Sequence, residues 1–227
     1  MRLKELLDTS EIIMKIFDLF VLNKAFKIND ESLFLKALKM YSLQGKFSHA
    51  SRIFMLYEKI FGFVDNKAYP LLLNSFITAI KSEKNLNEVL RSENLNEVTN
   101  YYDQKVSYLL EYNKDQSAAL SNLILQFYIA RQELSSMIPS KSLLSDTLSM
   151  SSSSLPPILQ VQLYFIRMNN ANITLFSSVW FDLCDFTEKY YFALLDEFVV
   201  IMERSNYLLP KHVKEVRFVN NYSVISI

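Results

Sequence analysis

The stretch ESLFLKALKMYSLQGKFSHASRIFMLYEKIFGFVD, residues 31–65, is the most informative part of the 227-residue chain, because it holds both of its glycines. Apolar residues before Gly45 recur on one helix face and predict a helix from near Asp30 to Gln44: Leu33, Phe34, Ala37, Leu38 and Tyr41. The opposite face of that helix presents Leu35, Lys39 and Ser42. A second buried face predicts a helix over residues 47–61: Phe47, Ala50, Ile53, Phe54, Tyr57 and Phe61. Gly62 then ends this helix in the left-handed conformation, so the stretch predicts two antiparallel helices.

Helical patterns continue on both sides of this pair. One helix is expected over residues 8–27, and another over 68–81 with Pro70 in its first turn, where the missing N–H is tolerated. Further helices are expected over 99–112, 117–134, 158–168, 175–186 and 188–204. Two asparagine-rich copies, at 85–89 and 94–98, suggest a surface expansion with a break near Ser92. The chain is therefore expected to be all-α.

Composition divides the chain into three parts. Residues 1–134 form a helical-repeat region, the serine- and proline-rich stretch 135–157 is the best candidate for a linker, and residues 158–227 form a C-terminal helical region. Residues 211–217 make a short basic segment before the tail. No apolar run is suited to cross a membrane as a helix, so no membrane span is expected.

The charge balance limits the kind of partner. The chain has 24 basic and 24 acidic residues, so it has no overall field to hold a polyanion, and any nucleic-acid binding must come from a local basic face. The single cysteine, Cys184, lies in an aromatic stretch and can form neither a disulfide framework nor a Cys-based zinc site within one chain.

The sequence lacks several motifs that indicate an enzyme. Two isolated glycines exclude a phosphate-binding loop and a dinucleotide fingerprint, because each needs several glycines within a few residues. His49 and His212 have no metal-ligand spacing, so His49 is interpreted as a surface residue and Cys184 as a core residue. The pairs Asp182/Asp185 and Asp196/Glu197 are interpreted as exposed charges, and Phe54, Tyr57 and Trp180 as core. We expect no enzyme activity, metal or cofactor.

The helix pair at residues 31–65 resembles a pentatricopeptide repeat. The family pattern has an aromatic residue early in the first helix and Gly-Lys at its end. The second helix has Ala and Phe four residues apart, and a late Gly and a closing Asp follow. In this chain these positions are occupied by Phe34, Gly45, Lys46, Ala50, Phe54, Gly62 and Asp65. Tyr69 begins the next register 35 residues after Phe34. Helical units of this period stack into solenoids, so the resemblance implies a short, degenerate α-solenoid like those of the pentatricopeptide and tetratricopeptide families.

The resemblance also implies a function. Proteins of this family bind single-stranded RNA without catalysis in mitochondria or plastids, where roughly one base is read per repeat. We therefore expect a mitochondrial protein that acts in transcript processing, stability or translation, with RNA and not DNA as its nucleic acid. The implied RNA-binding residues are Ser32, Leu35, Lys36, Lys39 and Asp65, of which Leu35 and Asp65 occupy the base-selecting positions.

A protein-interaction scaffold without RNA affinity is the alternative. It fits the zero net charge and the apolar Leu35 and Pro70. A stripe of exposed lysines that includes Lys36 and Lys39 would favour RNA, whereas an exposed apolar groove around Leu35 and Pro70 would favour a protein partner.

Overall fold

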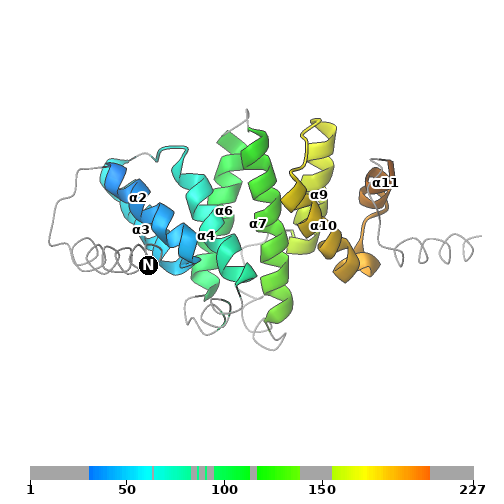
Figure 1. Cartoon of the computed structure of the whole chain (residues 1–227), viewed down its shortest axis with the longest axis horizontal. Helices are drawn as coiled ribbons and strands as arrows, with labels where there is room; N and C mark the ends of the chain where they lie inside the picture. The colour runs from blue at the N-terminus through cyan, green and yellow to red at the C-terminus, as the bar shows by residue number, and fades with distance from the viewer. Residues whose placement is uncertain are drawn as a thin grey trace, which may run out of the picture. The chain divides into compact units, whose positions relative to one another are not determined.

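The structure is a computed structural model that describes residues 31–62, 64–82, 86, 90, 95–112, 117–138 and 155–204. All regular elements within these residues are helices, which confirms the all-α prediction (Figure 1). The chain divides into two compact units, residues 1–114 and 115–227. Predicted elements that fall outside the described residues are the helix at 8–27, the basic segment at 211–217 and the tail at 218–227.

The first unit begins with the predicted helix pair. Helices α2 (Glu31–Gln44) and α3 (Phe47–Phe61) have the expected bounds and pack against each other. Gly45 has a φ of 65°, and the N–H of Lys46 donates to the carbonyl of Tyr41 at 3.0 Å, so the turn closes the end of α2. Gly62 has a φ of 71°, and its N–H donates to the carbonyl of Glu58 at 2.9 Å, as expected for a left-handed helix end.

The faces of this pair differ from the prediction at three positions. Leu33 was expected in the core, but it is 40% exposed, whereas Ser42 was expected on the outer face and is buried. The buried arc of α2 is therefore rotated toward Ser42, because α2 packs against α4 as well as α3. Phe61 is half-buried, although its ring still meets that of Phe34 edge-on at 5.6 Å.

Helix α4 (Ala68–Lys81) also has its predicted bounds, and Pro70 lies in its first turn. Helix α6 (Leu95–Tyr112) begins four residues earlier than the predicted Thr99, because Leu95 is buried and extends the apolar face backward. Tyr102 on α6 is fully buried, and its ring lies 5.2 Å from that of Phe76 on α4. Of the asparagine-rich duplication at 85–89 and 94–98, the structure describes residues 86 and 95–98, and the break expected near Ser92 lies outside the described residues.

The second unit contains α7 (Ala118–Met137), α9 (Pro157–Asn170), α10 (Ser177–Tyr190), the 3₁₀ turn η2 (Tyr191–Ala193) and α11 (Asp196–Arg204). Helix α7 packs against α9 and α10, and α9 packs against α11. The hydroxyl of Ser117 caps α7 by accepting from the N–H of Leu120 at 3.2 Å. Helix α7 extends three residues into the predicted linker and α9 begins at its last residue, while residues 139–154 are outside the described part.

The predicted continuous helix over residues 188–204 is wrong. Helix α10 runs on to Tyr190, and the chain then breaks through η2 before α11 begins. The buried amide of Gln162 on α9 donates to the carbonyl of Ala193 at 3.1 Å and accepts from the N–H of Leu195. The break is therefore stabilised by a tertiary partner that supplies the hydrogen bonds a helix would have made internally.

None of the described helices is both long and apolar enough to cross a membrane.

Candidate nucleic-acid interface

One face of α2 carries a continuous row of exposed side chains. Ser32, Lys36, Lys39 and Leu43 follow one another at intervals of four, three and four residues, and all four are exposed. These intervals place them on one side of the helix, opposite the buried Phe34 and Leu38. We call these four residues the α2 stripe. It contains three of the five residues predicted to contact RNA.

The other two predicted residues, Leu35 and Asp65, are half-buried. The carboxylate Oδ1 of Asp65 accepts from the N–H of Lys67 at 2.8 Å, and its carbonyl accepts from the N–H of Ala68 at 2.8 Å. Its own N–H donates to the hydroxyl of Tyr57 at 3.3 Å. Asp65 thus closes the turn that leads into α4, which is a structural role that needs no ligand.

Glu31, the first residue of α2, is also engaged inside the unit. Its carboxylate accepts a hydrogen bond from the hydroxyl of Tyr57 on α3. Burial, together with this hydrogen bond, raises the pKa of Tyr57 from 10.0 to about 12. The phenol is therefore protonated at neutral pH and connects the start of α2 to the turn that contains Asp65.

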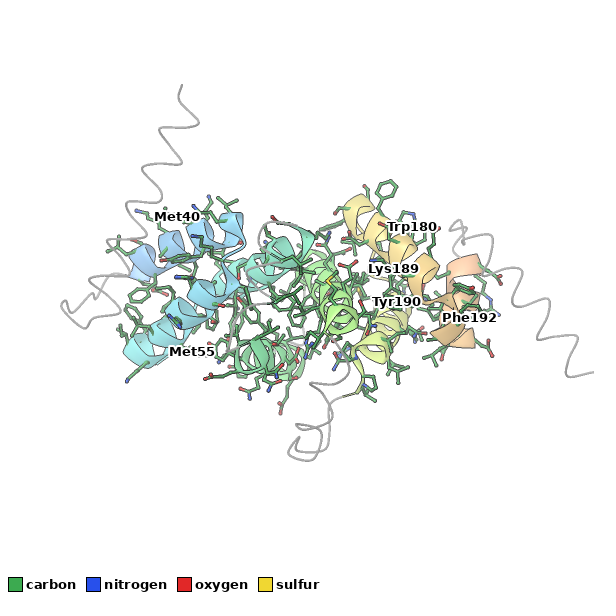
Figure 2. All side chains as sticks on the ribbon, turned by 90° about the horizontal axis from the view of Figure 1, so that it is seen from below. Met40, Met55, Trp180, Lys189, Tyr190 and Phe192 are labelled. Carbon is green, nitrogen blue, oxygen red and sulfur yellow. The ribbon has the colours of Figure 1, made fainter. Side chains whose placement is uncertain are left out.

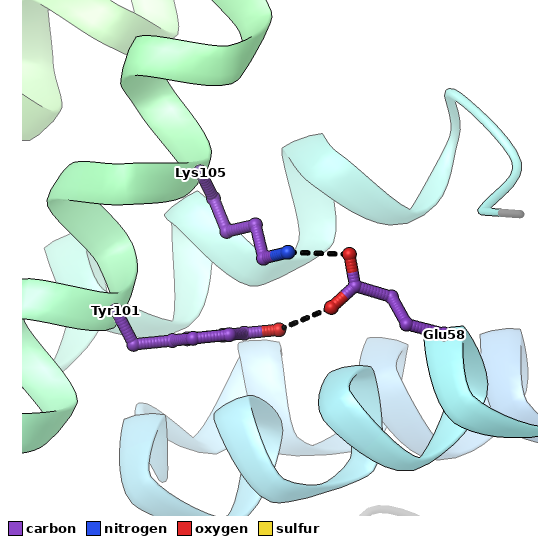
Figure 3. Close-up of polar contacts among 3 residues, drawn as sticks. All are labelled: Glu58, Tyr101 and Lys105. Carbon is purple, nitrogen blue, oxygen red and sulfur yellow. Dashed lines mark hydrogen bonds and ion pairs between the residues drawn. The ribbon is translucent and has the colours of Figure 1, made fainter. Parts of the chain in front are cut away.

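Glu58 on α3 is held by two residues of α6 (Figure 3). Its carboxylate forms an ion pair with Lys105 and accepts a hydrogen bond from the hydroxyl of Tyr101 at 3.0 Å. The Lys105 ammonium also lies 5.0 Å from the ring centroid of Tyr101 and 5.8 Å from that of Phe54. These contacts join α3 to α6 and neutralise Glu58 locally.

The phenols around Glu58 do not supply a reactive group at neutral pH. Burial raises the pKa of Tyr101, and burial with the nearby Tyr108 and Glu58 raises the pKa of Tyr69 to about 12. Both hydroxyls therefore remain protonated at neutral pH, and that of Tyr101 donates to Glu58. Sequence reasoning missed this cluster because nothing in the spacing of Tyr101 and Lys105 indicates that their partner is on α3.

These contacts leave the surface of the helix pair and α4 with an excess of positive charge. Residues 31–81 contain three acidic residues, Glu31, Glu58 and Asp65, each of which is hydrogen-bonded within the unit. The same range contains seven basic residues: Lys36, Lys39, Lys46, Arg52, Lys59, Lys67 and Lys81. The difference, seven minus three, gives a local charge of +4 in a chain that is neutral overall. This local basic region is what an interaction with a polyanion requires.

The other residues singled out in the sequence do not form a site. His49 was expected at the surface, but it is half-buried and its ring stacks on that of Tyr41 at 5.5 Å. Cys184 and Trp180 were expected in the core, and both are half-buried. Burial and the neighbouring Asp185 raise the pKa of the Cys184 thiol, which lowers its reactivity.

Three of the four carboxylates in the acidic pairs are exposed, as expected, and one is half-buried. Asp182 accepts a hydrogen bond from the amide of Gln126 at 2.7 Å, whereas Asp185, Asp196 and Glu197 are exposed. Within the described residues, no group of three or more His, Cys, Asp and Glu side chains is placed to hold a metal ion.

Comparison with known protein families, characterised proteins and solved structures gives no match for this chain.

Proposed function

We propose that the chain is a non-catalytic RNA-binding protein that holds single-stranded RNA on the first unit, with the α2 stripe as the centre of the interface. The observation that carries this proposal is the exposure of Lys36 and Lys39 on a single helix face, while the three carboxylates of residues 31–81 are engaged in internal hydrogen bonds. Lysines in such a row bind phosphates and gain free energy by releasing the counterions of the nucleic acid.

The packing of the first unit supports a solenoid-like arrangement as part of this proposal. Helix α2 packs against both α3 and α4, and α3 packs against both α4 and α6. In stacked helix pairs, the first helix of one pair contacts its own partner and the first helix of the next pair. On this proposal α2/α3 is one such pair and α4 begins the next, so the α2 stripe is one unit of a longer binding face.

The biological role follows from the resemblance to pentatricopeptide repeats. On this basis we propose that the protein acts on mitochondrial transcripts, in their processing, stability or translation, and needs no cofactor. Lys36 and Lys39 are assigned to phosphates and Ser32 to a polar contact with RNA. Leu35 and Asp65 are assigned no base contact, because Leu35 is apolar and the carboxylate of Asp65 already accepts from the N–H of Lys67.

A protein-interaction scaffold is the second candidate. The apolar side chains exposed on the helix pair favour it: Leu33 and Leu43 on α2, and Met55 and Ile60 on α3. In Figure 2, Met40 on α2 and Met55 on α3 lie at opposite edges of this pair. Leu35 and Pro70, which would line an apolar groove, are half-buried and do not form a contiguous exposed patch by themselves.

The test is a fluorescence-anisotropy titration with a labelled A/U-rich single-stranded RNA pool and a double-stranded RNA of equal length. Lys36→Glu/Lys39→Glu should weaken binding to the single-stranded pool by about tenfold or more, because two attractive phosphate contacts become repulsive. Arg52→Glu/Lys59→Glu is the matched control, since it makes the same charge change at two exposed positions of α3. Equal losses for both variants, or preference for the duplex, would contradict the proposed interface.

A further inference from the structure

The second unit carries a stripe of opposite charge to that on α2. Along α10, Phe181, Asp185 and Glu188 follow one another at intervals of four and three residues and are exposed, with Phe181 at 67%. They lie opposite the buried Val179, Leu183 and Phe186. We call these three residues the α10 stripe. Lys189, the residue that follows Glu188 in the chain, forms an ion pair with Glu133 of α7 at 3.4 Å.

Charge is distributed unequally along the chain. Residues 155–204 contain six acidic residues, Asp182, Asp185, Glu188, Asp196, Glu197 and Glu203, and three basic residues, Arg167, Lys189 and Arg204, which gives −3. Residues 31–81 carry +4. The chain is neutral overall because a basic region, residues 31–81, is balanced by acidic residues elsewhere, including those of residues 155–204. The α2 stripe contains the exposed apolar residue Leu43, and the α10 stripe contains Phe181.

The two stripes also match in spacing when one is read backward. From Leu43, Lys39 is four residues back and Lys36 is seven residues back; from Phe181, Asp185 is four residues on and Glu188 is seven residues on. In an antiparallel helix pair, this order places Leu43 against Phe181, Lys39 against Asp185 and Lys36 against Glu188. Alternating intervals of three and four residues are those at which packed helices stay in contact along their length.

We propose that copies of the chain associate head to tail, with the α2 stripe of one copy packed antiparallel against the α10 stripe of the next. Leu43 is 74% exposed in the single chain, so its burial against Phe181 favours the association, and two ion pairs fix the register. The stripes are different surfaces, so the interface is heterologous and leaves one free stripe at each end of the assembly. Because each end keeps one free stripe, further copies can add to form longer assemblies or closed rings.

The association covers Lys36 and Lys39, the residues proposed to bind RNA. Self-association and RNA binding at the α2 stripe are therefore mutually exclusive, and RNA should dissociate the assembly. The association itself does not depend on the proposed RNA binding, because the stripes match without any ligand. A contact of about two helical turns is small, so the dissociation constant is expected to be micromolar or weaker.

Analytical ultracentrifugation of the full chain without RNA tests the association. Wild type at low salt should show a weight-average sedimentation coefficient that increases over about 1–300 μM and falls when salt is raised. Lys36→Glu/Lys39→Glu and Asp185→Lys/Glu188→Lys should each shift this increase to concentrations at least about tenfold higher. Arg52→Glu/Lys59→Glu is the control and should behave as wild type.

Mixing the two stripe variants gives the decisive result. Each variant keeps one unmodified stripe, and the two modified stripes are again of opposite charge, so an equimolar mixture should associate like wild type. Misfolding of a variant would prevent this rescue, and circular dichroism of each variant gives an independent check. A wild-type chain that remains monomeric over the whole range, a control that abolishes association, or a mixture that stays monomeric would overturn the proposal. RNA is absent throughout, so failure of RNA binding cannot produce any of these results.

Discussion

Tyr102 is predicted to be the most sensitive single hydroxyl of the first unit. It is fully buried on α6, and its hydroxyl lies 3.0 Å from the carbonyl of Phe47 on α3 and 2.7 Å from the hydroxyl of Ser75 on α4. Three helices are thus joined through one oxygen atom. Tyr102→Phe keeps the ring but removes the donor, so the Phe47 carbonyl loses this hydrogen bond in a site closed to water.

The expected cost follows from these contacts. A buried acceptor without its donor costs about 1–3 kcal/mol, and ring burial is unchanged, so Tyr102→Phe should lower the free energy of unfolding by about 2 kcal/mol. Ser75→Ala should cost less, about 1 kcal/mol, because the Ser75 hydroxyl has one hydrogen, which goes either to the carbonyl of Leu72 at 2.6 Å in its own helix or to the hydroxyl of Tyr102 at 2.7 Å. The double variant should cost less than the sum, because the two residues share one hydrogen bond.

Urea unfolding followed by circular dichroism at 222 nm, with hydrogen exchange resolved by peptide, measures the effect. The only tryptophan, Trp180, lies on α10 in the second unit, so its fluorescence does not report directly on Tyr102. Exchange should accelerate in peptides from α3, α4 and α6. Tyr108→Phe is the control, since Tyr108 is on the same helix and 48% exposed. A loss below about 0.5 kcal/mol, or one equal to that of the control, would show that the hydroxyl of Tyr102 does not stabilise the contact of these helices.

Three further predictions test other parts of the structure. Asn122→Ala should destabilise the second unit by about 2 kcal/mol, because the Asn122 side chain donates to the carbonyl of Thr174 and accepts from the N–H of Phe176. Urea unfolding followed by Trp180 fluorescence measures this loss, and Asn169→Ala, at an exposed position, should have little effect. Gly62→Ala should lower the free energy of unfolding by about 1 kcal/mol, because residue 62 has a φ of 71°, which is unfavourable for alanine. A steric clash does not contribute, since nothing lies within 4 Å of the added Cβ. Thermal unfolding measures the loss, and an unchanged stability would contradict this explanation. Stability should fall as the pH rises from 10 toward 12, because burial raises the pKa of Tyr57 from 10.0 to about 12, so the unfolded phenol ionises first. Tyr57→Phe should remove up to about 2.7 kcal/mol of this change in the free energy of unfolding. An unchanged dependence of stability on pH would show that ionisation of Tyr57 does not cause the loss.

The helices at residues 31–81 could be predicted because local signals are strong there. Two glycines mark helix ends, and Pro70 is in a first turn, so the bounds of α2, α3 and α4 follow from backbone preferences alone. The exposure of Lys36 and Lys39 follows from the same helical period.

The break after Tyr190 could not be predicted, because it depends on a residue far away in the sequence. Residues 188–204 contain neither Gly nor Pro, and the hydrogen bonds that hold the break come from Gln162 on α9. The structural role of Asp65 and the pairing of Glu58 with Lys105 are likewise tertiary features. Periodicity shows which face of a helix is apolar, but it does not show which polar residue on another helix lies opposite.

The salt dependence of RNA binding shows whether Lys36 and Lys39 contact phosphates. For single strands, the slope of log K against log salt is about −0.7 for each phosphate neutralised, so losing the contacts of Lys36 and Lys39 should make the slope shallower by about 1.4. We predict this change for Lys36→Glu/Lys39→Glu and a much smaller one for Arg52→Glu/Lys59→Glu, in folded proteins titrated with the same single-stranded RNA. An unchanged slope for the α2 variant, or no binding by wild type even at low salt, would contradict the account and favour a protein partner for this surface.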